Sequence, residues 1–172
     1  MNLEEFNNAP EAEAALFLAP CAPIASWSHA LVAGRPYASR RQLLEAARAQ
    51  AGGWTDAEVD AALAHHPRIG EKPPQPHAVP VGVGRAEAEH ALREQAGVRT
   101  DAATAAHWLE ANRAYEQRFG RIFLIRAAGR SQAELFAQLK ERLGNDDATE
   151  ARVRAEQLAE IAVLRLDGQL KD

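Results

Sequence analysis

Apolar residues recur at spacings of three and four along most of the chain, with polar and charged residues between them. This spacing places the apolar side chains on one face of a helix. Strong helix formers (Ala, Leu, Glu, Arg and Gln) dominate, and runs of β-branched residues are almost absent. The pattern therefore predicts an all-α fold in which nearly every segment is helical.

Capping residues and helix breakers divide this pattern into separate helices. Ser39 has the position of an N-cap, and Thr55 with Glu58 and Ser131 with Glu134 have the spacing of capping boxes. The helix that begins after Thr55 is expected to run into a His-His pair. The expected helices span residues 10–18, 23–34, 40–51, 56–66, 86–96, 101–119, 132–143 and 149–166.

Two stretches interrupt the helical pattern. Residues 73–85 contain four prolines and two glycines, which excludes a continuous helix and predicts a long loop. Residues 122–125 (Ile-Phe-Leu-Ile) form a short apolar run between two arginines, which we interpret as a buried extended segment. With no internal repeat, the simplest interpretation is one compact multi-helix domain over residues 1–172.

Composition narrows the class of protein. The 172 residues are 47% hydrophobic and 26% charged, as in ordinary globular proteins, and the net charge of −4 argues against a general nucleic-acid binder. Cys21 is the single cysteine, so it forms no intramolecular disulfide and fits a reducing compartment. The acidic start lacks the pattern of a secretion signal, and no apolar run reaches about 20 residues. We therefore expect a cytoplasmic protein without a membrane segment.

Arg165 stands out among the candidate functional residues. A helical projection of residues 149–166 places it within the apolar face formed by Leu158, Ile161, Ala162 and Leu166. A guanidinium buried there requires a partner, either a carboxylate of the protein or an anionic ligand. The bland alternative is that Arg165 extends to solvent at the helix end or forms a structural ion pair.

The histidines give a second set of candidates. His66 lies at an expected helix end, where it could act as an acid, a base or a ligand, or could simply stabilise the helix dipole. His90 and Glu94 are four residues apart on one helix face, a spacing that suits two metal ligands and equally suits a solvated surface. No glycine-rich phosphate loop or nucleophile elbow is present, so a nucleotide cofactor is not expected.

Taken together, several stretches resemble the 2-oxo-4-hydroxy-4-carboxy-5-ureidoimidazoline (OHCU) decarboxylase family. They occur in the family's order at residues 64–72, 93–97, 112–120, 122–125, 129–131, 141–146 and 161–166. The resemblance implies an all-helical, cofactor-free enzyme without a metal, often homodimeric. Such an enzyme decarboxylates the small molecule OHCU to (S)-allantoin in the degradation of urate.

The resemblance also implies roles for individual residues. His66, Glu94 and Arg165 correspond to the family's catalytic residues. The implied substrate-binding residues are Arg165 again, together with Pro67, Ala91, Gln95, Phe123, Leu124 and Ile125. The last three would bind the substrate through backbone groups. Two positions depart from the family: Ala91 replaces a usual serine, and Arg121 replaces a frequent aromatic residue.

Two other functions remain open on the residues alone. A metal-dependent hydrolase could use His66, His90 and Glu94 as ligands, and would lose its activity on treatment with a chelator. A helical binding module without catalysis would use the same residues only for capping and ion pairing.

Overall fold

The computed structural model describes residues 1–64, 66, 68–70, 89–90, 93 and 101–171. Within these residues the chain forms eight helices and no strand, which confirms the expected all-α fold. The loop expected at 73–85 lies outside the described residues, as does most of the helix expected at 86–96. Glu89, His90 and Arg93 of that expected helix are helical.

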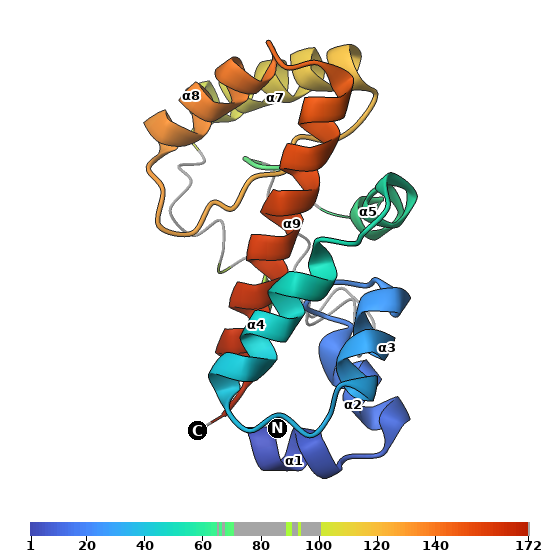
Figure 1. The fold of residues 1–172 in the computed structure, drawn as a ribbon. Helices are drawn as coiled ribbons and strands as arrows, with labels where there is room; N and C mark the ends of the chain where they lie inside the picture. The colour runs from blue at the N-terminus through green and yellow to red at the C-terminus, as the bar shows by residue number, and fades with distance from the viewer. Residues whose placement is uncertain (65, 67, 71–88, 91–92, 94–100, 172) are drawn as a thin grey trace.

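Helix α9 (Asp147–Gln169) runs through the middle of the molecule, and α4 (Arg40–Ala51) packs along its lower half (Figure 1). Helix α9 begins two residues before its expected start at Thr149. The reason is Asp146, whose side chain accepts a hydrogen bond of 2.7 Å from the Thr149 backbone N–H and so caps the helix. The 23 residues of α9 therefore connect both ends of the fold.

The lower end of the molecule contains α1 (Leu3–Asn8), α2 (Glu11–Leu18) and α3 (Ala25–Ala33). Helix α1 was not among the expected ranges. Asn2 and Glu5 begin it with a reciprocal capping box, in which each side chain accepts from the other residue's N–H, at 2.9 and 2.8 Å. The two termini meet here, because Lys171 N–H donates to the Met1 carbonyl.

Helix α5 (Asp56–Leu63) leaves the side of α9 at mid-height and ends earlier than expected. The sequence predicted a helix that continues into His65 and His66, and this was wrong. The described chain leaves the helix after Leu63, with Ala64 as the C-cap. A residue that precedes a proline is disfavoured in the helical region, which is the physical reason for a stop ahead of His66.

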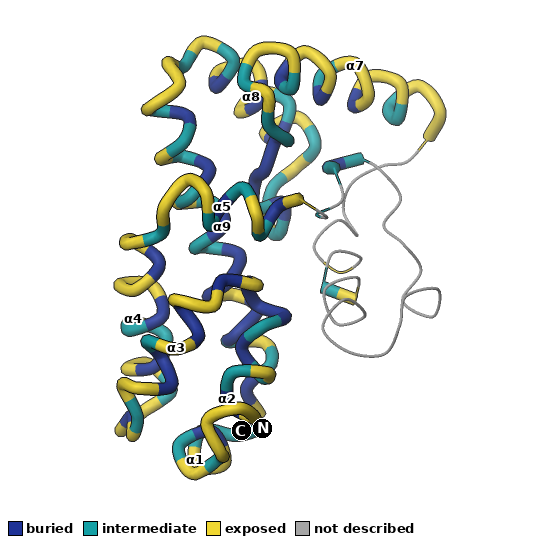
Figure 2. Tube along the Cα trace, turned by 90° about the vertical axis from the view of Figure 1, so that its right-hand side faces the viewer, coloured by how far each residue is buried: buried dark blue, intermediate teal, exposed yellow. Residues whose placement is uncertain are grey.

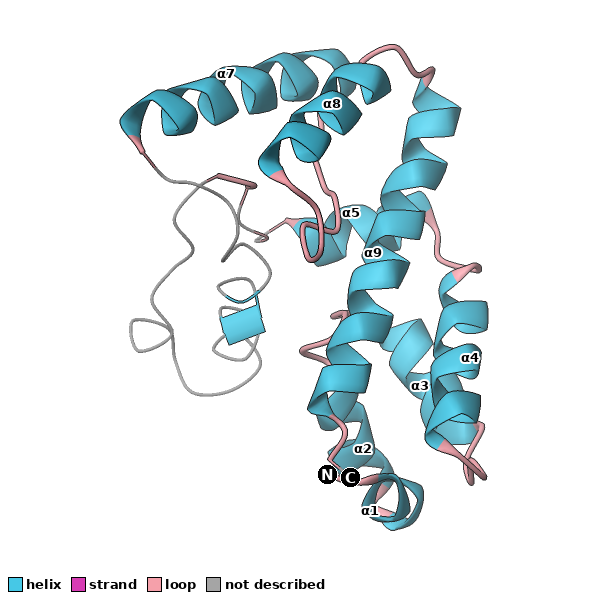
Figure 3. Ribbon diagram, turned by 90° about the vertical axis from the view of Figure 1, so that its left-hand side faces the viewer, coloured by secondary structure: helices cyan, strands magenta, loops and turns pink. Residues whose placement is uncertain are grey.

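Helices α7 (Ala102–Phe119) and α8 (Gln132–Arg142) lie across the upper end of α9 (Figure 3). Gly120 ends α7 at φ +65°, in the left-handed conformation that glycine adopts without strain. The chain then crosses to α8 through residues 121–131, drawn as a loop in Figure 3.

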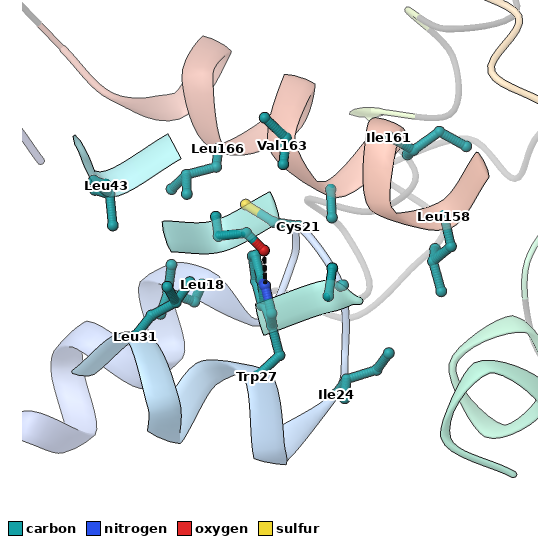
Figure 4. Close-up of a cluster of buried hydrophobic side chains, with 14 of the residues drawn as sticks. Leu18, Cys21, Ile24, Trp27, Leu31, Leu43, Leu158, Ile161, Val163 and Leu166 are labelled. Carbon is teal, nitrogen blue, oxygen red and sulfur yellow. Dashed lines mark hydrogen bonds between the residues drawn. The ribbon is translucent and has the colours of Figure 1, made fainter. Parts of the chain in front are cut away.

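Two hydrophobic cores result, and buried positions line the inner sides of the helices in Figure 2. The lower core joins α1–α5 to α9, and Trp27 at its centre donates from Nε1 to the Ala47 carbonyl at 2.9 Å (Figure 4). The upper core contains Trp108 and Tyr115 of α7 with Leu135 of α8. No described helix is long and apolar enough to cross a membrane.

Candidate functional site

Arg165 is buried in the lower half of α9, with only 5% of its surface exposed. It lies among Ile161, Ala162 and Leu166, as the helical projection predicted. Its Nη1 donates to the Pro20 carbonyl at 3.4 Å, so the loop between α2 and α3 supplies one of its contacts. The alternative in which Arg165 extends to solvent is therefore wrong.

The structure brings His66 to this buried arginine. His66 Nε2 lies 3.3 Å from Arg165 Nη2, although the two residues are 99 positions apart. A guanidinium only donates hydrogen bonds, so Nε2 is the acceptor in this contact and the proton of a neutral imidazole is on Nδ1. The buried guanidinium of Arg165 and the half-buried imidazole of His66 thus lie side by side. Together these two groups can bind and polarise an anionic substrate.

The loop that carries His66 is attached to α7 by polar contacts. Arg68 forms a two-pronged ion pair with Glu116, in which Nη2 lies 3.1 Å from Oε2. The buried amide of Asn112 donates to the Ile69 carbonyl at 3.0 Å. Because both contacts act within four residues of His66, α7 fixes the backbone that presents the imidazole.

Gly70 closes the same loop directly against Trp108. Its φ is +79°, and a Cβ atom built on it would lie 2.4 Å from Trp108 Cγ, far inside van der Waals contact. Trp108 is buried in the upper core and cannot move aside without disturbing that core. Both backbone conformation and space therefore require glycine at this position.

The change Gly70→Ala is expected to lower the free energy of unfolding by at least about 1 kcal/mol, since a side chain is strained at this φ and clashes with the indole. Gly53→Ala is the matched control, because its Cβ would meet only the Gln50 carbonyl at an ordinary 3.5 Å. Urea unfolding of the two variants measures the difference. Equal stabilities would contradict the tight packing of the His66 loop on α7.

Cys21 is buried in the lower core, close enough to Arg165 to be affected by its charge. The thiol donates to Oε1 of Gln169 at 3.5 Å, and the Gln169 amide donates in turn to the Phe17 carbonyl at 2.7 Å. Burial raises the pKa of the Cys21 thiol to about 12, against the opposing effect of the nearby Arg165 charge. Cys21 is therefore a neutral packing residue next to the site, which excludes it as a thiolate nucleophile near neutral pH.

We expect Cys21 in the folded protein to react very slowly with a disulfide reagent such as DTNB at pH 8. A thiol with a pKa of about 12 is ionised in only about one molecule in ten thousand at that pH. In 6 M guanidinium chloride the same thiol should react completely within minutes. Rapid labelling of the native protein would contradict the burial of Cys21 in the lower core.

The apolar run at 122–125 is non-helical, and its last three residues are buried as expected, whereas Ile122 is half-buried. Leu124 points into the lower core, whereas Phe123 and Ile125 point into the upper core, so the side chains alternate as in a strand. No hydrogen bond within the described part of the chain involves the backbone of Phe123 or Ile125. These buried N–H and C=O groups are available to bind a ligand that carries amides.

A buried charge network holds this segment from behind. Arg142 at the end of α8 and Glu150 in the first turn of α9 are 4% and 1% exposed, and Arg142 Nη2 lies 2.5 Å from Glu150 Oε1. The Tyr115 hydroxyl donates to the same carboxylate oxygen, and Asn145 donates to the other at 2.8 Å. Arg142 Nη1 also donates to the Leu124 carbonyl at 2.8 Å. None of these four side chains is among the site residues expected from the sequence.

Several expected site residues lie outside the described residues: Pro67, Ala91, Glu94 and Gln95. The structure thus unites His66 with Arg165 and leaves the role of Glu94 as a prediction. Arg121, which replaces the family's aromatic residue, turns to α5 and forms ion pairs with Asp56 and Asp60 at 3.8 and 3.4 Å. His90 contacts Arg93, with Nδ1 3.4 Å from Nη2.

Two further observations concern possible sites elsewhere. Among the described residues, no three His, Cys, Asp or Glu side chains form a group that could hold a metal ion. A groove of about 820 Å³ lies between α4 and α9, lined by Trp54, Ala159 and Val163 among others. Neither His66 nor Arg165 lines it, so this groove is separate from the candidate site.

Comparison with known proteins gives a family match over nearly the whole chain. The model of the family described as OHCU decarboxylase matches residues 7–167. The chain is 33% identical over 107 residues to "Uric acid degradation bifunctional protein TTL" of Arabidopsis thaliana, covering 61% of this chain and 31% of that protein. It is 40% identical over 73 residues to "2-oxo-4-hydroxy-4-carboxy-5-ureidoimidazoline decarboxylase" of Amia calva, covering 42% of each. The chain thus spans less than half the length of these two relatives.

Solved structures show the same fold. A crystal structure of OHCU decarboxylase in the presence of (S)-allantoin superposes with a TM-score of 0.69 at 23% identity, covering 90% of this chain and 96% of that one. A crystal structure of (S)-allantoin synthase superposes equally well at 19% identity, covering 99% of this chain and 54% of that one. At these identities the likeness concerns the arrangement of the helices.

Proposed function

The chain belongs to the OHCU decarboxylase family, and from this we propose that it converts OHCU into (S)-allantoin and carbon dioxide in the degradation of urate. The observation that carries the proposal is the contact of 3.3 Å between His66 and the buried Arg165, in a chain whose family match includes both residues. The family match favours this reaction over the metal-dependent hydrolase and over the binding module.

In the proposed mechanism, Arg165 and the free backbone groups of Phe123 and Ile125 hold the ring and the ureido group. The ureido group and the ring amide carry N–H donors and C=O acceptors, which match the backbone groups of the segment. The segment and Arg165 are related through the lower core. Leu124 packs in this core together with the α9 face that carries Arg165, which consists of Leu158, Ile161 and Ala162. Binding through several fixed groups orients the substrate for one reaction.

His66 engages the hydroxyl and carboxylate region of the substrate, with Glu94 hydrogen-bonded to a ring or hydroxyl proton. The bond between the ring carbon and the carboxylate breaks, carbon dioxide leaves, and the electron pair passes into the imine-containing ring. The hydroxyl group on that carbon loses its proton and becomes a carbonyl group. A proton adds from one face to the neighbouring ring carbon, which bears the ureido group, and this sets the S configuration. The positive charge of Arg165 stabilises the electron density that develops in the ring.

The test is to generate OHCU in situ from urate and follow allantoin by circular dichroism, with and without the protein and with added EDTA. Spontaneous decay gives little net optical signal, so the proposal predicts a fast signal of one sign that EDTA leaves unchanged. A trace equal to the blank would overturn the decarboxylase. Loss of the signal with EDTA would instead support the metal-dependent alternative.

We also propose that the protein is a cytoplasmic homodimer. The support is the resemblance to a family of frequent homodimers, together with a single cysteine that is buried and free, as suits a reducing compartment. Light scattering coupled to size-exclusion chromatography tests the assembly, and a mass of one chain would contradict it.

A further inference from the structure

We infer that Arg142 is a positioning residue, which orients the backbone of residues 123–125 so that the polar groups of Phe123 and Ile125 face the substrate. This inference rests on the proposed function. It concerns a residue that lies behind the segment and binds its backbone through the Leu124 carbonyl.

The backbone groups of residues 123–126 alternate in direction along the segment. In an extended chain, the N–H and C=O groups of alternate residues point to opposite sides. Arg142 binds the Leu124 carbonyl at 2.8 Å, and Gln157 of α9 accepts from the Arg126 N–H at 2.9 Å. Protein side chains thus bind the even-numbered residues, so the odd-numbered groups of Phe123 and Ile125 point the other way.

The charge network explains why Arg142 can act as a rigid support. Its guanidinium is held by Glu150 on one edge and lies over the Phe123 ring, with Cζ 4.6 Å from the ring centroid. Glu150 is itself fixed by the Tyr115 hydroxyl and the Asn145 amide. These contacts restrain the Arg142 side chain to a single position, and Arg142 in turn fixes the orientation of the Leu124 carbonyl.

A buried ion pair is a poor way to gain stability alone, since apolar residues of similar volume often serve as well. We explain the burial of the Arg142–Glu150 pair by the hydrogen bond from Arg142 to the Leu124 carbonyl. The inference can therefore be tested by replacing the charge network with apolar residues that preserve packing. Such a variant loses the hydrogen bond from Arg142 to the Leu124 carbonyl but keeps the core filled.

The experiment uses the triple variant Tyr115→Phe/Arg142→Met/Glu150→Leu. We expect a folded protein that melts cooperatively, with kcat/KM reduced at least tenfold, mainly through a higher KM. Binding of (S)-allantoin, measured by calorimetry, should weaken by a similar factor. A folded triple variant with KM and allantoin affinity within twofold of the wild type would overturn the inference.

Arg142→Lys provides a second test should the triple variant not fold. Lysine keeps the buried charge beside Glu150 but lacks the planar fork that reaches the carboxylate and the carbonyl together. A raised KM is expected, and an unchanged KM in a folded protein would overturn the inference. Leu31→Ala, a core truncation in α3, is the control for lost stability and should leave KM unchanged at temperatures well below its melting point.

These outcomes are distinct from failure of the proposed function. If the wild-type protein does not turn over OHCU, the decarboxylase proposal fails first. If the wild-type protein is active and the folded variants match it, only the role of Arg142 is overturned.

Discussion

Replacing His66 with alanine is expected to lower kcat by about 10²- to 10⁴-fold, the range typical of a lost general acid or base. The imidazole lies 3.3 Å from Arg165 in the site but belongs to neither hydrophobic core. Its loss should therefore leave the fold and the melting temperature nearly unchanged. Steady-state kinetics on OHCU and a thermal melt of the same sample measure both quantities.

His29→Ala is the matched control for this variant. His29 is an exposed histidine of α3, outside the candidate site, so its replacement should leave kcat unchanged. A His66→Ala enzyme with activity near that of His29→Ala would remove His66 from the mechanism.

Replacing Arg165 with alanine should act mainly on binding, with KM raised roughly 10- to 100-fold, as expected when a charged hydrogen-bond donor of about 1.5–3 kcal/mol is lost. The residue is 5% exposed and is held by the Pro20 carbonyl, so it is already oriented before substrate arrives. Arg165→Met keeps most of the buried volume and separates the loss of charge from the formation of a cavity.

Arg152→Ala controls for loss of a positive charge from the same helix. The Arg152 side chain is 65% exposed and pairs with Glu156 one turn away, so KM should stay at the wild-type value. An unchanged KM in both Arg165 variants would contradict the proposed binding role.

The sequence was most informative where local rules decide the structure. Arg165 could be assigned to a buried position because helical periodicity alone places it among Ile161 and Leu166. The same periodicity indicates a buried position for Asn112, since it lies four residues after Trp108 and three before Tyr115 on the buried face of α7. The capping spacing of Asn2 and Glu5 likewise indicates α1.

Other features depend on tertiary structure and leave no local signal. Arg142 has the position of a basic residue at a helix end, and Glu150 that of an acidic residue in a first turn. Each is explained locally, so nothing in the sequence indicates that the two are buried together behind Leu124. The pairing of His66 with Arg165 spans 99 residues, and only the resemblance to a family suggested it.

A crystal structure with bound (S)-allantoin would test whether decarboxylation takes place where His66 and Arg165 meet. We expect the product within hydrogen-bond distance of the Arg165 guanidinium and of a backbone group of Phe123 or Ile125, with the His66 side chain in contact with it. Product bound instead in the groove between α4 and α9, with no contact to His66 or Arg165, would contradict this location of the active site.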